Sequence, residues 1–266
     1  MNLNRNYTLA LRELAGNGAL THNIAMVDVL SCSIRMLALL VPMLAASVAG
    51  AATVAVDVGH SRELPGAMSA RGRAEFDFNL ELAADIDAAL RLRGVASRLV
   101  GADGDMVRLT ARTRAAGGTD FLLSVHHDSV QPHYLEDWEY AGETRRYSDR
   151  FSGFSLFVSR KNAGLARSRR CASAIGAALR SAGFVPSLYH AERIAGESKP
   201  FADRENGVHY FDNLVVLKKA ASPAVLLEAG VIVNRTEELE MAQPATRQRI
   251  ASAVAEGISS CLPAKR

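Results

Sequence analysis

Two histidines and a glutamate lie where apolar segments of the chain end or helical patterns begin. His60 follows the apolar run at residues 53–58, His126 follows the apolar run at residues 121–125, and Glu75 stands at the start of a helical pattern. In open α/β sheets, ligands bind at the carboxyl ends of the strands. Two histidines and one glutamate leave a fourth coordination position free, as in catalytic rather than structural zinc sites. The sequence therefore predicts a catalytic zinc site.

A fourth segment ends in a carboxylate. Residues 223–227 are apolar, Glu228 follows them, and Ala-Gly comes next. A buried strand does not end in glutamate without a partner or a purpose, because removing a charge from water costs free energy. Taken alone, each of the four segments is a weak signal, since a single histidine after a strand is more often a hydrogen-bonded structural residue. Because all four segments occur in one chain, we expect their histidines and carboxylates to lie together in a single site.

Two aspartates lie close to the predicted ligands. Asp57 precedes His60 by three residues, and Asp128 follows His126 by two. Either carboxylate could hydrogen-bond a ligand imidazole and fix its orientation. A role in a turn or a helix cap is an equally good interpretation of each.

The elements that must position these residues alternate short apolar runs with helical periodicities from residue 52 onward. This pattern predicts an α/β fold, a single-domain three-layer sandwich in which a mostly parallel twisted sheet has helices on both faces. Strands are expected at residues 53–58, 95–100, 121–125, 154–159, 214–217 and 224–227, and helices at residues 75–93, 106–116, 165–182 and 244–262. Two irregular stretches, residues 128–152 and 186–213, interrupt the alternation.

The N-terminal segment has the features of an export signal. Arg35 precedes an apolar run at residues 36–48, which is too short to cross a bilayer comfortably, and Ala-Gly-Ala at residues 49–51 fits a cleavage site. We therefore expect a signal peptide at residues 1–51, whose true start could be Met26 or Met36, and a catalytic domain at residues 52–266. No cysteine stands at the cleavage point, so no lipid or other stable membrane anchor is expected after cleavage. The expected location is the periplasm, with the extracellular space as the alternative.

Composition limits the partners and the redox state. The chain has 266 residues, 48% of them hydrophobic and 22% charged, with a formal net charge of +3. This nearly balanced charge gives no reason to expect a nucleic-acid partner. Cys171 and Cys261 remain after signal cleavage, each within an expected helix. A disulfide between them is possible in an oxidising compartment, but two free thiols are the expected state.

The four segments resemble the zinc-dependent N-acetylmuramoyl-L-alanine amidase family with the amidase type 3 catalytic domain. The motifs D-x-G-H, E-x-x-x-N-L, S-[IV]-H-x-[ND] and P-A-V-L-x-E-x-G fit Asp57–His60, Glu75–Leu80, Ser124–Asp128 and Pro223–Gly230, in the order of the family. The resemblance extends from Val54 to about Ile258. Val58 and Ser61 stand where the family commonly has Pro and Gly, and neither position is a predicted ligand.

The resemblance implies a set of roles for these residues. His60, Glu75 and His126 correspond to the zinc ligands, and the motif selects His126 rather than its neighbour His127. Glu228 corresponds to the catalytic carboxylate, which would take a proton from the attacking water and pass it to the leaving amine of L-alanine. The implied substrate is peptidoglycan or its muropeptide fragments, and we expect the enzyme to act as a monomer. A need for a protein activator is left open.

The resemblance also gives a use to the irregular stretch at residues 128–152. Its aromatic residues Trp138, Tyr140 and Tyr147 offer faces on which sugar rings could stack, so we expect it to contact substrate, with a lid or a regulatory cover as alternatives. Two other functions stay open. A zinc peptidase that cuts within the peptide stem would use the same chemistry, and a wall-binding module with a decayed metal site would belong to a different functional class.

Overall fold

Most of the expected apolar runs form strands of one central sheet in the computed structural model, which describes residues 52–262. The predicted export signal at residues 1–51 lies outside the described residues. The sheet has seven strands in the order β2-β1-β3-β9-β6-β8-β7. The strands are β1 (Thr53–Val58), β2 (Ala96–Val100), β3 (Phe121–Asp128), β6 (Ser155–Val158), β7 (Phe201–Asp203), β8 (Val208–Tyr210) and β9 (Ala224–Val231).

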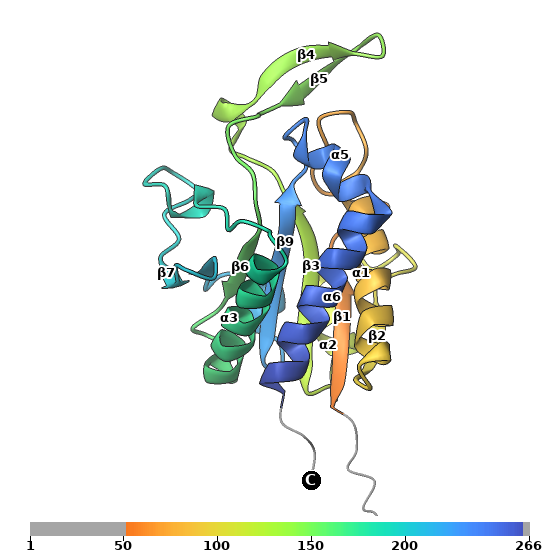
Figure 1. Ribbon diagram of the computed structural model, residues 1–266, viewed down its shortest axis with the longest axis vertical. Coiled ribbons are helices and arrows are strands. Elements are labelled where there is room, and N and C mark those ends of the chain that lie inside the picture. The colour runs from red at the N-terminus through yellow and green to blue at the C-terminus, as the bar shows by residue number, and fades with distance from the viewer. Residues whose placement is uncertain (1–51, 263–266) are drawn as a thin grey trace, which may run out of the picture. The chain divides into compact units, whose positions relative to one another are not determined.

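The central part of the sheet is parallel. Strands β2, β1, β3 and β9 run in the same direction, and β6 pairs with β8 in parallel as well. Two pairs are antiparallel, β6 with β9 and β7 with β8. The predicted mostly parallel sheet is confirmed, and the carboxyl ends of β1, β3 and β9 lie along one edge (Figure 1).

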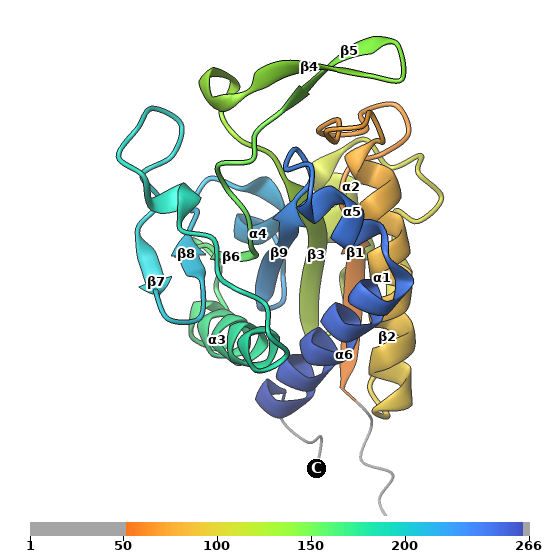
Figure 2. The same ribbon diagram turned by 45° about the horizontal axis from the view of Figure 1, so that its top comes forward.

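Helices cover both faces of the sheet because its buried strands are apolar on both sides. On β1, Val54 and Val56 pack into the larger core with α1, α3 and α6, whereas Ala55 belongs to a second core on the opposite face with α4. The helices are α1 (Glu75–Leu92), α2 (Leu109–Ala115), α3 (Leu165–Ser181), α4 (Val215–Lys218), α5 (Glu237–Ala242) and α6 (Pro244–Cys261). Figure 2 shows α2 and α4 beyond the sheet from α1, α3 and α6.

The fold corrects three details of the expected elements. Residues 214–217 were expected to form a strand, but the helix α4 occupies them, because a run of four apolar residues fits a buried helical turn as well as a strand. The irregular stretch at residues 186–213 contains β7 and β8, which extend the main sheet. The short helix α5 has too few residues for its periodicity to identify it.

The stretch at residues 128–152 forms a hairpin rather than an irregular loop. Strands β4 (Glu136–Tyr140) and β5 (Glu143–Tyr147) pair antiparallel beyond the carboxyl edge of the main sheet (Figure 1). Ala141 and Gly142 connect them with φ angles of 53° and 80°, so both turn residues are left-handed, which suits a two-residue hairpin. Alanine in the first of these positions, together with mostly charged strands, hides the hairpin from sequence patterns.

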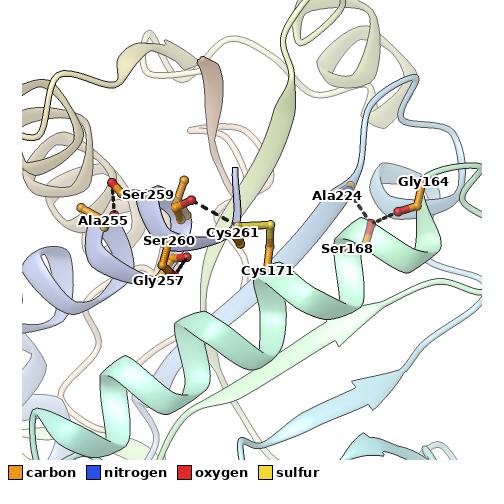
Figure 3. The surroundings of a disulfide bond; sticks show 10 residues. Gly164, Ser168, Cys171, Ala224, Ala255, Gly257, Ser259, Ser260 and Cys261 are labelled. Carbon is orange, nitrogen blue, oxygen red and sulfur yellow. Dashed lines mark hydrogen bonds between the residues drawn. A yellow bond between two sulfur atoms is a disulfide. The ribbon is translucent and has the colours of Figure 1, made fainter. Parts of the chain in front are cut away.

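A disulfide joins Cys171 of α3 to Cys261 of α6 across a Cα–Cα distance of 5.1 Å (Figure 3). The expectation of two free thiols is therefore wrong. The two helices pack side by side in the larger core, and this packing brings together residues that are 90 positions apart in the chain. Sequence spacing alone carried no information about that contact.

Candidate active site

His60, Glu75 and His126 come together at the edge where β1 and β3 end and α1 begins. The parallel register pairs Val58 with Val125, so His60, two residues after the end of β1, lies close to His126, which is still within β3. Glu75 lies between them, with Oε2 3.0 Å from His60 Nε2 and Oε1 3.0 Å from His126 Nδ1. The three ligating atoms lie within 4.8 Å of one another.

Gly59, the residue before His60, allows His60 and His126 to lie close together. A Cβ atom on Gly59 would lie 2.4 Å from ring atoms of His126, so only glycine lets the two strand ends come this close. His60 itself has a φ angle of 68°, which is costly for a residue with a side chain. The guanidinium of Arg112 donates hydrogen bonds to the carbonyl oxygens of Val58 and His60 and thereby holds this conformation.

Glu75 is buried, with 4% of its surface exposed, and is held in the ionised form. Burial alone would raise the pKa of its carboxyl group, but the hydrogen bonds and charges of His126 and His60 hold that pKa well below its usual value. Ala67 N–H and Asn79 Nδ2 donate further hydrogen bonds to the two oxygens at 3.0 and 3.1 Å. The carboxylate is therefore fixed in position between two imidazoles.

These residues fit a zinc ion. Two imidazole nitrogens and a carboxylate oxygen form a donor set that zinc takes in catalytic sites, where a fourth position remains for water or substrate. His60 and His126 both line a cavity of about 580 Å³, which leaves that position accessible. His127 takes no part: its ring packs on Phe78 with centroids 5.4 Å apart, and Nδ1 lies 2.8 Å from Asn79 Oδ1. Burial lowers its pKa to about 3.

Glu228 lines the same cavity as His60 and His126. It is on β9, paired with His126 of β3 in the parallel ladder. Within residues 52–262, no group hydrogen-bonds its buried Oε2 atom. Burial raises the pKa of the Glu228 carboxyl group well above the usual value, and the neighbouring charges of Asp128 and Glu75 raise it further. A carboxyl group with a raised pKa binds a proton more readily than an ordinary carboxyl group, which is the property of a general acid or base.

The remainder of the cavity is mainly apolar. Leu109 of α2, Val215 of α4, Phe211 and Leu226 are among the apolar side chains that line it. Apolar walls exclude water and strengthen the interactions of the polar groups that share the cavity. The arrangement suits hydrolysis of a bond held beside those polar groups.

Asp57 and Asp128 hydrogen-bond groups other than the imidazole rings of His60 and His126. Asp57 accepts hydrogen bonds from Arg112 Nη1 at 2.8 Å and from Ser124 Oγ at 2.7 Å. It therefore supports His60 indirectly, through the arginine that holds the backbone. Asp128 pairs with His190 Nε2 at 2.7 Å.

The sequence did not indicate that three further ionisable residues lie together at the cavity. His190, Glu197 and Lys199 all come from the stretch at residues 186–213 and line the cavity wall near Glu228. They follow no strand of the predicted core, and their spacing matches no ligand pattern. The one available signal was the concentration of ionisable residues in a segment without apolar periodicity.

The aromatic residues of the hairpin are not among those that line this cavity. Trp138 donates its indole N–H to the carbonyl oxygen of Ala70 at 3.0 Å, and its ring lies 5.2 Å from the ring of Tyr140. Guanidinium groups of Arg71 and Arg235 lie 5.5 and 5.2 Å from the Trp138 ring centroid. Contact between these rings and sugars stays a prediction.

A family model and two known amidase sequences match this chain. The sequence model described as N-acetylmuramoyl-L-alanine amidase, type 3, matches residues 54–260. The N-acetylmuramoyl-L-alanine amidase AmiA of Salmonella typhimurium is 28% identical over 219 residues, which cover 78% of this chain and 75% of that protein. AmiA of Escherichia coli is 28% identical over 223 residues, which cover 79% and 76% of the two chains.

Solved structures share the fold. The N-acetylmuramyl-L-alanine amidase Ami1 from Mycobacterium smegmatis superimposes with a TM-score of 0.62 at 21% identity, covering 79% of this chain and 96% of that one. The N-acetylmuramoyl-L-alanine amidase from Clostridium difficile 630 gives a TM-score of 0.60 at 20% identity, with coverage of 79% and 96%. Among residues 52–262, no helix combines the length and apolar character needed to cross a membrane.

Proposed function

Because the chain belongs to the type 3 N-acetylmuramoyl-L-alanine amidase family and hydrolyses peptidoglycan, we propose that it does so with zinc held by His60, Glu75 and His126 and with Glu228 as the proton-transfer residue. The observation that supports this most is the convergence of two imidazoles on the Glu75 carboxylate, at the end of a cavity that also contains Glu228. The bond cut is the amide between N-acetylmuramic acid and L-alanine.

Each residue has a distinct part in this hydrolysis. Zinc bound by the three ligands would activate water and polarise the scissile carbonyl group. Glu228 takes a proton from the attacking water as the new C–O bond forms, and it returns this proton to the alanine nitrogen as the C–N bond breaks. Its raised pKa matches both steps, since the carboxyl group must change its protonation state twice in each cycle.

Arg112 and Asp57 preserve the geometry of the site. The buried pair is 2.8 Å apart, and the guanidinium holds the carbonyl group of His60 in its left-handed conformation. Their contribution is to keep the His60 ring pointed at Glu75 before substrate arrives. Rigid support of this kind keeps catalytic groups within a few tenths of an ångström of their working positions.

The location of the enzyme is part of the proposal. We propose that residues 1–51 are removed as an export signal and that residues 52–266 act as a monomer in the periplasm, without a membrane anchor. The Cys171–Cys261 disulfide supports export, because disulfides persist in oxidising compartments. N-terminal sequencing of the protein recovered from the periplasmic fraction is expected to begin after Ala51. Recovery of the uncleaved chain from the cytoplasm would contradict export.

The decisive experiment uses the purified protein at residues 52–266 and defined muropeptides. With zinc, mass spectrometry is expected to detect the free peptide that begins with L-alanine together with the intact sugar. A chelator is expected to abolish this release, and added zinc to restore it. A product cut within the peptide stem would instead identify a peptidase, and unchanged release in the presence of chelator would exclude the metal role.

A further inference from the structure

A buried ionic network joins the end of β3 to the segment at residues 187–199. The ring of His190 lies between two carboxylates, with Nε2 2.7 Å from Asp128 Oδ2 and Nδ1 2.7 Å from Glu197 Oε2. The His190 side chain is 8% exposed, and those of Asp128 and Glu197 are 10% and 5% exposed. None of these three residues is a predicted zinc ligand.

The two carboxylate contacts determine the protonation state of the His190 ring. An ionised carboxylate only accepts hydrogen bonds, so both ring nitrogens of His190 carry protons and the imidazole is a cation. Burial alone would lower the pKa of His190, but the charges and hydrogen bonds of Asp128 and Glu197 raise it to about 9. Glu197 also accepts hydrogen bonds from Lys199 Nζ at 2.5 Å and from Gln131 Nε2 at 2.8 Å. Two cations therefore balance two carboxylates.

The segment at residues 187–199 forms one wall of the catalytic cavity. Its residues Gly196, Glu197 and Lys199 line the cavity that contains Glu228. The backbone closes on itself where Lys199 N–H donates to the carbonyl oxygen of His190 at 2.8 Å. Residues 190–199 therefore form a loop that this hydrogen bond closes. The His190 side chain attaches the closed loop to β3 through Asp128.

We propose that His190 is a positioning residue for substrate binding, which fixes the wall at residues 187–199 to the strand end that follows His126. This inference rests on the proposed function of the cavity. Both ring nitrogens are already engaged, so His190 acts through the groups it holds rather than by contacting substrate. The groups it positions are Glu197 and the ammonium group of Lys199, which lies 4.8 Å from the Phe211 ring centroid at the cavity surface.

Loss of the proton from His190 would free the wall. A neutral ring presents a lone pair to one of the two carboxylates, which replaces an attraction with a repulsion in a buried setting. The other ionisable groups that face this network are Lys199, Tyr189, His209 of β8, whose ring centroid is 5.9 Å from that of His190, and Glu228, which lines the same cavity. Substrate binding should therefore weaken as pH rises through about 9.

The first test separates binding from bond cleavage. In the zinc-loaded enzyme, His190→Gln is expected to raise KM for a defined muropeptide by on the order of 10- to 100-fold, with a much smaller change in kcat. Placed in a Glu228→Gln background, the same substitution should raise the Kd for the uncleaved muropeptide by a similar factor. The matched control Arg180→Gln removes one positive charge from an exposed ion pair on α3 and should change neither constant.

The second test keeps His190 in the chain and removes its proton by raising the pH. The Kd of the Glu228→Gln enzyme should be constant from pH 7 to 8 and rise through pH 9, together with faster proteolysis within residues 187–199. His190→Lys, which keeps the positive charge, should retain tight binding through pH 9. A Kd that does not change between pH 7 and 10 would overturn the proposal, as would a folded His190→Gln variant that loses kcat or zinc while KM is unchanged.

These tests distinguish a failure of the His190 proposal from a failure of the proposed function. That function fails if the unmodified enzyme releases no peptide beginning with L-alanine, or releases it equally in chelator. The role of His190 is decided by the binding constants of the Glu228→Gln pair and by the protease sensitivity of the segment, neither of which requires turnover.

Discussion

Glu75 and Glu228 are two buried carboxyl groups of the candidate site whose pKa values are shifted in opposite directions. Burial acts to raise the pKa of both, but two imidazoles offset it at Glu75 and no hydrogen-bond donor among residues 52–262 reaches Oε2 of Glu228. Glu75 is therefore suited to hold a cation, and Glu228 to exchange a proton. Environments that push two pKa values apart in this way commonly separate the roles of paired carboxyl groups.

Glu228→Gln tests the proton-transfer role. The amide keeps the shape of the side chain but cannot take up a proton, so kcat is expected to fall by about 10²- to 10⁴-fold. Zinc content, measured by atomic absorption, should stay at one equivalent because the three ligands are intact. Glu205→Gln, in an exposed ion pair with Arg180, is the control and should be fully active. Near-normal kcat in Glu228→Gln would contradict the assignment.

Gly59→Ala tests the close approach of the two strand ends. The added methyl group would meet ring atoms of His126 at 2.4 Å, so the ring must move away from Glu75. Displacement of a catalytic group by about 1 Å can cost on the order of 100-fold in activity, and we expect this loss together with weaker zinc retention on dialysis. Gly94→Ala, which meets no atom within 4 Å, should lower stability slightly but keep zinc. Equal zinc retention in the two variants would refute this explanation.

The elements that surround the site differ in how they are attached to it. Helix α1 delivers Glu75 with its first residue, and β1 and β3 deliver the histidines near their ends, so three core elements meet at the candidate metal ligands. The wall at residues 187–199 is joined to the core by a backbone hydrogen bond, from Ser187 to Phe154, and by side-chain contacts that include those of His190 and Gln131. A binding wall attached in this way can change between related enzymes without disturbing the ligands.

The disulfide between α3 and α6 is expected to stabilise the domain rather than the reaction. It closes a loop over a sequence separation of 90 residues. Replacing both cysteines by alanine should lower the free energy of unfolding by about 2–5 kcal/mol, because the unfolded chain regains conformational freedom. Urea denaturation would measure this, with the reduced original protein as the control. Activity of the folded variant should be unchanged, and an unchanged unfolding midpoint would contradict a stabilising role.

At the scale of the whole domain, two buried histidines limit stability on opposite sides of neutrality. Burial lowers the pKa of His209 to about 4, so its stabilising contribution is complete above pH 6.5 and is lost as the pH falls through about 4. The carboxylates around His190 raise its pKa to about 9 against the opposing effect of burial. Its contribution is complete below pH 6.5 and is lost as the pH rises through about 9.

The combined contribution of these two histidines to the unfolding free energy is therefore expected to be largest near pH 6.5. Each histidine can contribute on the order of 3 kcal/mol, since one unit of pKa corresponds to about 1.4 kcal/mol. Urea denaturation at pH 4, 6.5 and 9.5 measures both sides of the maximum. In His190→Gln, the decrease between pH 6.5 and 9.5 should be smaller than in the original protein. Equal decreases in the two proteins would assign the alkaline side to other groups.

The sequence by itself determined the residues of the candidate metal site and the central layers of the fold. His60 and His126 could be placed together because each follows an apolar run, and parallel strands end at one edge of a sheet. Glu75 could be added because, with two histidines, it completes a donor set that zinc takes in catalytic sites. Glu228 could be added because a carboxylate at the end of a buried strand needs a partner or a purpose. The periodicities of these segments are strong enough to predict β1, α1, β3 and β9.

Only the tertiary structure decided which distant segments meet there. The hairpin and strands β7 and β8 have too few apolar residues to show a period, so their pairing depends on neighbours elsewhere in the chain. Cys171 meets Cys261 because α3 packs on α6, and His190 meets Asp128 because the chain returns to the end of β3 after 62 residues. Local patterns record which face of an element is buried, but not which element covers it.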